Sequence, residues 1–249
     1  MDSETRRLFV AFRRHDRLTL PIGILSREGS PDAPGYTFVY LKRAESLVDF
    51  QPLPGLSNIH KVHSSDTMFP VFANRLMSPE RPDFHAWMKS LDLEPDADIF
   101  DVLERSGGRR VTDTLELFPF PERDGSILRT RFFVRGVRHV PGAEEKILML
   151  QEGSRLEMTR DTNNPVSNLA LHLADPEHGV LGFVPEYLVE TIDQLQQING
   201  RYPRVTVEQI NRGASPSMMA LCRMEAAWPG SFQPFSGPGF QPLVVEHVS

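Results

Sequence analysis

Residues 155–159 read RLEMT and residues 169–174 read LALHLA, and in both stretches every second residue is a large apolar one. Successive side chains of a strand point to opposite faces, so a period of two predicts half-buried β-strands. Shorter apolar runs at 179–184, 205–207 and 219–224 predict three more strands. The simplest architecture for so many short strands is a small barrel.

A single helix is expected among these strands. Leu188, Ile192 and Leu195 recur at four- and three-residue spacing between Pro185 and Asn199-Gly200. Proline is favoured at the first helical position and glycine just after the last. The pattern predicts one helix packed on the barrel.

The first 120 residues carry a different pattern. Residues 8–12, 18–25 and 36–40 are apolar or rich in β-formers, with a Gly-, Pro- and Asp-containing turn at 29–35, and they predict an antiparallel sheet. Residues 52–70 show no periodicity and are expected to form a long loop. Helical spacing then predicts two short helices near 84–91 and 99–103, the second ended by Gly107-Gly108.

Two domains and a tail follow from these patterns. The change of period comes after a stretch of Pro, Glu, Arg, Asp and Gly at 119–125. We expect one domain at 1–120, a second at 129–228, and an extended Pro-, Gly- and Phe-rich tail at 229–249. The expected fold class is α+β, with an N-terminal antiparallel sheet and short helices followed by a C-terminal small β-barrel with its helix.

The composition excludes several classes of protein. Cys222 is the single cysteine, so neither a disulfide framework nor a Cys-rich zinc site is expected. Apolar stretches are shorter than the ~18 residues of a membrane span, and the charged start is unlike a signal peptide, so we expect no membrane partner and a cytoplasmic location. The net charge of −6 argues against a uniformly basic nucleic-acid coat but allows a local basic patch.

The second half resembles the HIRAN domain, a small OB-like module attached to helicase-type DNA-remodelling proteins and also free-standing in bacteria. The residues that carry the resemblance are VRGVRH at 134–139, GSRL at 153–156, RDTNNP at 160–165, NLAL at 168–171 and GVLGFVP at 179–185. The resemblance implies an OB-like form of the barrel. Because helicase-type members grip a single-stranded DNA 3′ end, it also implies that single-stranded or 3′-end DNA is the partner.

The same resemblance assigns roles to single residues. Arg138 and His139 fall where the family has an arginine and an aromatic residue, and Asn164 falls on an asparagine of the family's pocket. Val166 and Ser167 stand where those members carry a base-stacking aromatic and an acid that accepts the terminal hydroxyl. The resemblance therefore implies a groove for the DNA backbone with altered reading of the DNA end.

The first half resembles the N-terminal subdomain of HipA-type serine/threonine kinases. The matching stretches are GIL at 23–25, YTFVY at 36–40, PLPG at 52–55, MFPVFANRL at 68–76 and DIFDVL at 98–103. No His-Arg-Asp or Asp-Phe-Gly segment of a kinase core follows. The resemblance implies that any link to a kinase runs through a partner protein, as in a toxin–antitoxin pair.

Arginines suited to nucleic acid concentrate in two stretches. Arg129, Arg131 and Arg135 share one face of an expected strand with Phe133, which makes the mixed charged and aromatic surface that single strands bind. The second stretch is the turn at 160–165, at the end of the expected barrel where OB-type modules place ligand loops. The alternatives are a strand edge guarded by charge and a plain Asn-Asp turn. The candidate DNA-binding residues are Arg129, Arg131, Arg135, Arg138, His139, Arg160, Asn163 and Asn164.

No set of residues predicts catalysis. His60, His63 and Asp66 lie in a Ser-rich loop without a third strong ligand nearby, and Gly107-Gly108-Arg109-Arg110 lacks the Lys-Ser/Thr of a P-loop. Cys222 lies in an apolar strand, where a thiol is inert. We expect no catalytic residue, no metal and no cofactor, and hence no enzyme.

Two functions remain open. The leading hypothesis is a non-catalytic nucleic-acid-binding protein whose barrel holds single-stranded or end-containing DNA, while the N-terminal domain recruits a protein partner. The alternative is a regulatory, antitoxin-like interaction protein that docks on a HipA-like kinase.

Overall fold

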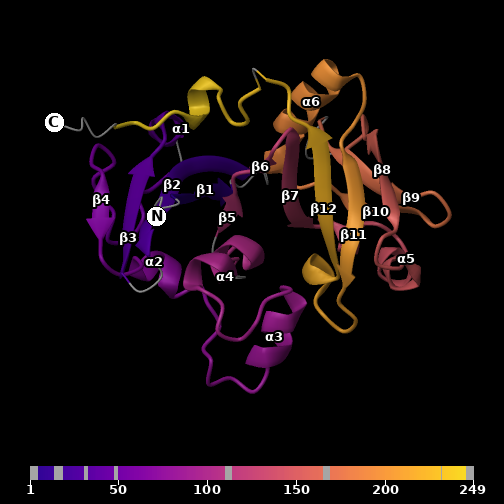
Figure 1. Ribbon diagram of the computed structural model, residues 1–249, viewed down its shortest axis with the longest axis horizontal. Helices are drawn as coiled ribbons and strands as arrows, with labels where there is room; N and C mark the ends of the chain where they lie inside the picture. Colours follow the sequence, from indigo (N-terminus) through magenta and orange to yellow (C-terminus); the bar gives the residue numbers. More distant parts are fainter. Residues whose placement is uncertain are drawn as a thin grey trace. The chain divides into compact units, whose positions relative to one another are not determined.

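The computed structural model describes residues 5–13, 19–30, 33–47, 50–109, 114–164, 169–230 and 232–244. The chain divides into two compact units, one of residues 1–89, 93–120 and 235–249 and one of residues 90–92 and 121–234. Each unit has an antiparallel sheet of its own, and among the described residues neither sheet continues into the other unit (Figure 1). The α+β class is confirmed.

The first unit is built on the predicted antiparallel sheet. Its five strands lie in the order β4 (His63–Ser65), β3 (Ala33–Tyr40), β2 (Thr19–Ser30), β1 (Arg6–Arg13) and β5 (Leu115–Pro119). Every neighbouring pair is antiparallel. The long loop expected at 52–70 contains β4, a strand of three residues that is too short to show a period in the sequence.

Four helices accompany this sheet: α1 (Lys42–Glu45), α2 (Pro70–Ala73), α3 (Phe84–Ser90) and α4 (Ile99–Ser106). The Asp98 carboxylate accepts the Phe100 N–H at 2.8 Å and begins α4, and Gly107 ends it at φ 70°, which confirms the predicted glycine cap. Phe100 and Leu103 of α4 are fully buried in the core of this unit. The same aspartate makes an ion pair, because Arg27 Nη1 of β2 lies 3.3 Å from Asp98 Oδ1.

Residues 229–249, which we expected as an extended tail, contribute to both units. In the second unit Phe232 packs on Trp228, with ring centroids 5.9 Å apart. In the first unit Phe235 and Phe240, the latter in the short 3-10 helix η3 (Pro238–Phe240), pack on Phe9 of β1 at 4.8 and 5.6 Å. The aromatic residues of this segment are therefore part of the packed structure.

The second unit holds a seven-stranded sheet. Its order is β10 (Gly179–Phe183), β9 (Leu171–Asp175), β8 (Arg155–Arg160), β11 (Arg204–Ile210), β12 (Ala220–Ala227), β7 (Ile127–Phe133) and β6 (Glu122–Asp124). A closed barrel needs a ladder of hydrogen bonds between its first and last strands. In the described part of the chain these strands form an open sheet, and the residues after β7 meet β10 at one isolated bridge, Arg135 with Phe183. The predicted OB-like barrel is corrected to this open sheet.

Two helices and two 3-10 turns complete the second unit: η1 (Val137–His139), α5 (Ala143–Met149), α6 (Glu186–Asn199) and η2 (Pro216–Met218). The predicted helix is α6, preceded by Pro185 and ended by Gly200 at φ 72°. The sequence pattern missed α5, which spans seven residues. The predicted alternation also fails at Leu169, which is exposed, because β9 begins two residues later.

The described helices include none that is long and apolar enough to cross a membrane.

The buried Arg27–Asp98 pair gives a test of the first unit. The Arg27 side chain is 8% exposed, so Asp98→Ala leaves a buried guanidinium without its counter-ion and also removes the α4 cap. We expect the free energy of unfolding in urea to fall by about 3 kcal/mol. The matched control is Asp83→Ala, whose partner Arg81 is exposed. This control should leave stability nearly unchanged; equal effects of the two substitutions would contradict the role given to the buried pair.

Candidate nucleic-acid interface

Two of the predicted DNA contacts on β7 face carboxylates. Arg129 Nε donates to Glu225 Oε1 at 3.0 Å, and its Nη1 donates to Asp124 Oδ2 at 3.0 Å. Arg131 Nε donates to Glu208 Oε2 at 2.7 Å. Both arginines therefore already have anionic partners within the second unit.

A third arginine completes this network. Arg223 of β12 lies 3.2 Å from Glu208 and 3.6 Å from Glu225. Glu208 comes from the irregularity in β11 between Val207 and Gln209, the kind of bulge that turns an additional side chain toward a neighbouring strand. Three arginines and three carboxylates balance across β6, β7, β12 and β11. The role of Arg129 and Arg131 in DNA binding stays a prediction, and a phosphate would have to compete with these carboxylates.

The predicted turn after β8 is organised by one carboxylate. Asp161 accepts the Asn163 backbone N–H and the Asn164 Nδ2 amide, each at 3.1 Å. Arg160 donates to the Leu169 carbonyl and pairs with Asp193 of α6. The structure thus brings Arg160, Asn163 and Asn164 together, with Arg160 holding the base of the turn. Val166 and Ser167 lie outside the described residues.

An aromatic pair beside this turn was missed from the sequence. His172 of β9 and Phe183 of β10 are direct cross-strand partners with ring centroids 4.8 Å apart, and both are half-buried. His172 Nε2 also lies 3.2 Å from Asp161 Oδ2. The available signal was the alternation in LALHLA, where the histidine occupies an outward position.

Phe183 connects this aromatic pair to the remaining candidates. Arg135 and Phe183 exchange both backbone hydrogen bonds, at 2.9 and 2.8 Å. The next residue, Gly136, has φ 65°, and a Cβ there would lie 2.7 Å from the Phe183 ring. This turn leads directly into η1, which carries Arg138 and His139. Only glycine satisfies both the backbone angle and the close approach of the ring.

Arg138 and His139 differ from the β7 arginines in their surroundings. Both are exposed. Within the described ranges neither side chain has a hydrogen bond or an ion pair, whereas Arg129 and Arg131 each do.

We use the name "rim" for the following residues, which are joined by the contacts above or, for Arg138 and His139, by their place in η1 directly after Gly136: Arg135, Arg138, His139, Asp161, Asn163, Asn164, His172 and Phe183. The region combines guanidinium groups, which suit phosphodiesters, with aromatic rings and amides, which suit bases. Its one carboxylate, Asp161, is engaged by an amide, a backbone N–H and the His172 ring.

The other candidates for chemistry are not brought together. Among the described residues no three His, Cys, Asp or Glu side chains form a group that could hold a metal. His63 Nε2 instead contacts the Asn58 carbonyl at 2.9 Å. Cys222 is buried in β12, and this burial raises the pKa of its thiol.

Comparison with known proteins gives two structural matches. No family model matches the chain, and no curated protein matches its sequence. The HIRAN domain of human HLTF is matched at a TM-score of 0.32 and 15% identity, over 42% of this chain and 81% of that domain. A protein from Lactobacillus plantarum is matched at the same TM-score and identity, over 40% and 98%. At these values the matches carry no argument about function. The HipA resemblance of residues 1–120 stays a prediction.

The close approach of Gly136 to Phe183 can be tested by a pair of substitutions. Gly136→Ala adds both backbone strain and a methyl group against the ring, whereas Gly125→Ala, at φ 58° with no atom within 4 Å of the added Cβ, adds only the strain. We expect Gly125→Ala to cost about 1 kcal/mol and Gly136→Ala a further 1–3 kcal/mol, roughly, in urea unfolding. Equal costs would show that Phe183 does not hold this turn.

The buried thiol gives a second test. A raised pKa keeps Cys222 protonated in the folded protein at pH values where an exposed cysteine ionises. Since the thiolate is the reactive form, we expect Ellman's reagent to label the native protein very slowly at pH 8 to 9 and the urea-unfolded protein at once. Rapid labelling of the native protein, at a rate that rises with pH as for a free thiol, would contradict the burial.

Proposed function

We propose that the second unit binds single-stranded DNA at the rim. The observation that carries the proposal is the exposure of Arg138 and His139, whose side chains have no hydrogen bond or ion pair to any residue that the structure describes. They follow Gly136, which packs against the Phe183 ring of the Phe183–His172 pair. Fixed positive charge next to aromatic surface is how single strands are bound without a base-pairing partner.

Different residues of the rim are proposed to contact different parts of the DNA strand. Arg138 and Arg135 contact phosphates, Asn163 offers its amide to base edges, and Asn164 contacts the strand while its Nδ2 stays bonded to Asp161. Phe183 and His172 supply ring surface, which contributes on the order of 1–3 kcal/mol for each stacked base. Arg160 and Asp161 position the turn through Asp193, Asn164 and His172 and are positioning residues.

The sequence resemblance to HIRAN domains also raises the question of whether the protein distinguishes the 3′ end of a DNA strand. With Val166 and Ser167 in place of the aromatic and the acid, the protein is proposed to bind a free 3′ hydroxyl and a blocked 3′ end with equal affinity. The N-terminal domain is proposed to recruit a protein partner.

The experiment is a fluorescence-anisotropy titration with a labelled oligonucleotide of about ten nucleotides. We expect a dissociation constant in the micromolar range or weaker at physiological salt. Arg138→Ala should weaken binding severalfold and lower the salt slope by roughly 0.7. The matched control is Arg155→Ala, another exposed arginine outside the rim. Arg129→Ala should reduce DNA affinity by a smaller factor than Arg138→Ala, because the Arg129 side chain is already bound by Glu225 and Asp124.

Two results would overturn this function. One is absence of binding even at low salt. The other is an Arg138→Ala variant that binds DNA as the unaltered protein does but loses a protein interaction, which would favour the regulatory alternative of docking on a HipA-like kinase.

A further inference from the structure

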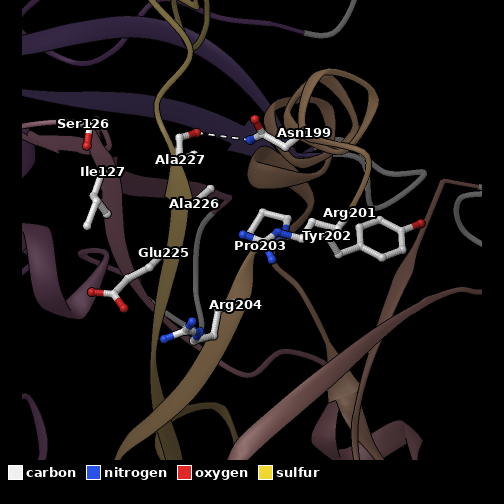
Figure 2. Close-up of a pocket in the computed structure, with 10 residues that line it drawn as sticks. All are labelled: Ser126, Ile127, Asn199, Arg201, Tyr202, Pro203, Arg204, Glu225, Ala226 and Ala227. Atoms are coloured by element: carbon white, nitrogen blue, oxygen red, sulfur yellow. Dashed lines mark hydrogen bonds between the residues drawn. The ribbon is translucent and has the colours of Figure 1, made fainter.

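A cavity of about 600 Å³ lies in the second unit where α6 ends and β11 begins (Figure 2). Its lining shares no residue with the rim. Figure 2 shows the segment after α6 and the start of β11 on one side, with Arg201 and Arg204, and β7 and β12 on the other, with Ile127 and Ala226. The volume is in the range of sites for small molecules.

The arginines of this cavity have no anionic partner among the described residues. Arg201 and Arg204 are both exposed, and no hydrogen bond or ion pair engages either side chain there. Glu225 is the cross-strand partner of Arg204 in the register of β11 and β12. Its carboxylate, however, is held by Arg129 at 3.0 Å and Arg223 at 3.6 Å. Glu225 also lines the cavity, but its carboxylate is paired with Arg129 and Arg223 and forms no ion pair with Arg204 among the described residues.

The remaining walls are mostly apolar. Ile127, Pro203, Ala226 and Ala227 contribute aliphatic surface, and Ile127 is 40% exposed, unusual for a large apolar side chain. Asn199, the last residue of α6, donates its Nδ2 amide to the Ala227 carbonyl at 3.2 Å and keeps its Oδ1 available as an acceptor. A ligand for this cavity therefore needs an anionic group and a partly apolar body with a donor.

We propose that the cavity binds a phosphate monoester on a body the size of a nucleoside. Two guanidiniums that have no counter-ion in the described ranges fit the charge of about −1.5 to −2 that a phosphate monoester carries near pH 7, and their planar donors suit its oxygens. The C-terminal end of α6 adds partial negative charge nearby, which one guanidinium alone would barely outweigh. The two guanidiniums together outweigh this partial charge, and their two positive charges match a dianion better than a singly charged carboxylate.

A phosphate monoester of this size could come from a free nucleotide or from the 5′ end of a DNA strand. The two are distinguished by calorimetric titration of the full chain with AMP and with a short oligonucleotide that carries or lacks a 5′ phosphate. Adenosine is the control without a phosphate. Binding of AMP identifies a free nucleotide as a ligand, and a preference for the phosphorylated oligonucleotide without AMP binding identifies the strand end; both support the proposal.

The variants locate the binding. Arg201→Ala and Arg204→Ala should each lower the affinity for the phosphorylated ligand by at least about tenfold, because each removes a hydrogen bond to a charged group. Arg204→Lys, which keeps the charge but not the paired donors, should recover part of the affinity. Arg155→Ala should have no effect, and Arg138→Ala should leave AMP binding intact, so this test is independent of DNA binding at the rim. Thermal unfolding checks that the variants fold.

Three results would overturn the proposal: no AMP binding together with equal affinity for the strands with and without a 5′ phosphate, adenosine binding as well as AMP, or affinity for the phosphorylated ligand unchanged when both arginines of the cavity are replaced.

Discussion

The backbone bridge between Arg135 and Phe183 is the contact on which the arrangement of the second unit depends. It joins the chain leaving β7 to the end of β10, two strands that lie far apart in the order of the sheet. Through it the Phe183 ring is set against Gly136 on one side and His172 on the other. The proposed DNA site exists because residues from three separate stretches meet at this ring.

Charge compensation divides the arginines of this unit into two kinds. On β7 and β12 they are matched by Glu208, Glu225 and Asp124, so that face carries paired charges of both signs. On η1 and at the start of β11, Arg138 and Arg204 are left without such partners among the described residues. A net charge of −6 therefore coexists with local exposed arginines that have no carboxylate partner in the described part of the chain.

The sequence predicted the elements with strong periodicity and missed what depends on distant partners. Alternation located β8 and most of β9, and spacing with its flanking proline and glycine located α6. β4, with three residues, is too short to show a period, and the seven-residue helix α5 was also missed. The arginine pattern of β7 was visible, but two of its carboxylates, Glu208 and Glu225, lie 77 and 96 residues away from their arginine partners along the chain. The pairing of His172 with Phe183 depends likewise on register, which local sequence does not encode.

The most direct test of the rim is to map amide chemical shifts of the labelled protein during a titration with single-stranded DNA. The account predicts that the largest changes fall on residues 135–139, 161–164, 172 and 183, with small changes at Arg129 and Arg131. Changes concentrated on β7 and β12, with residues 135–139 unaffected, would contradict it and would show that the strand displaces the carboxylates of the network.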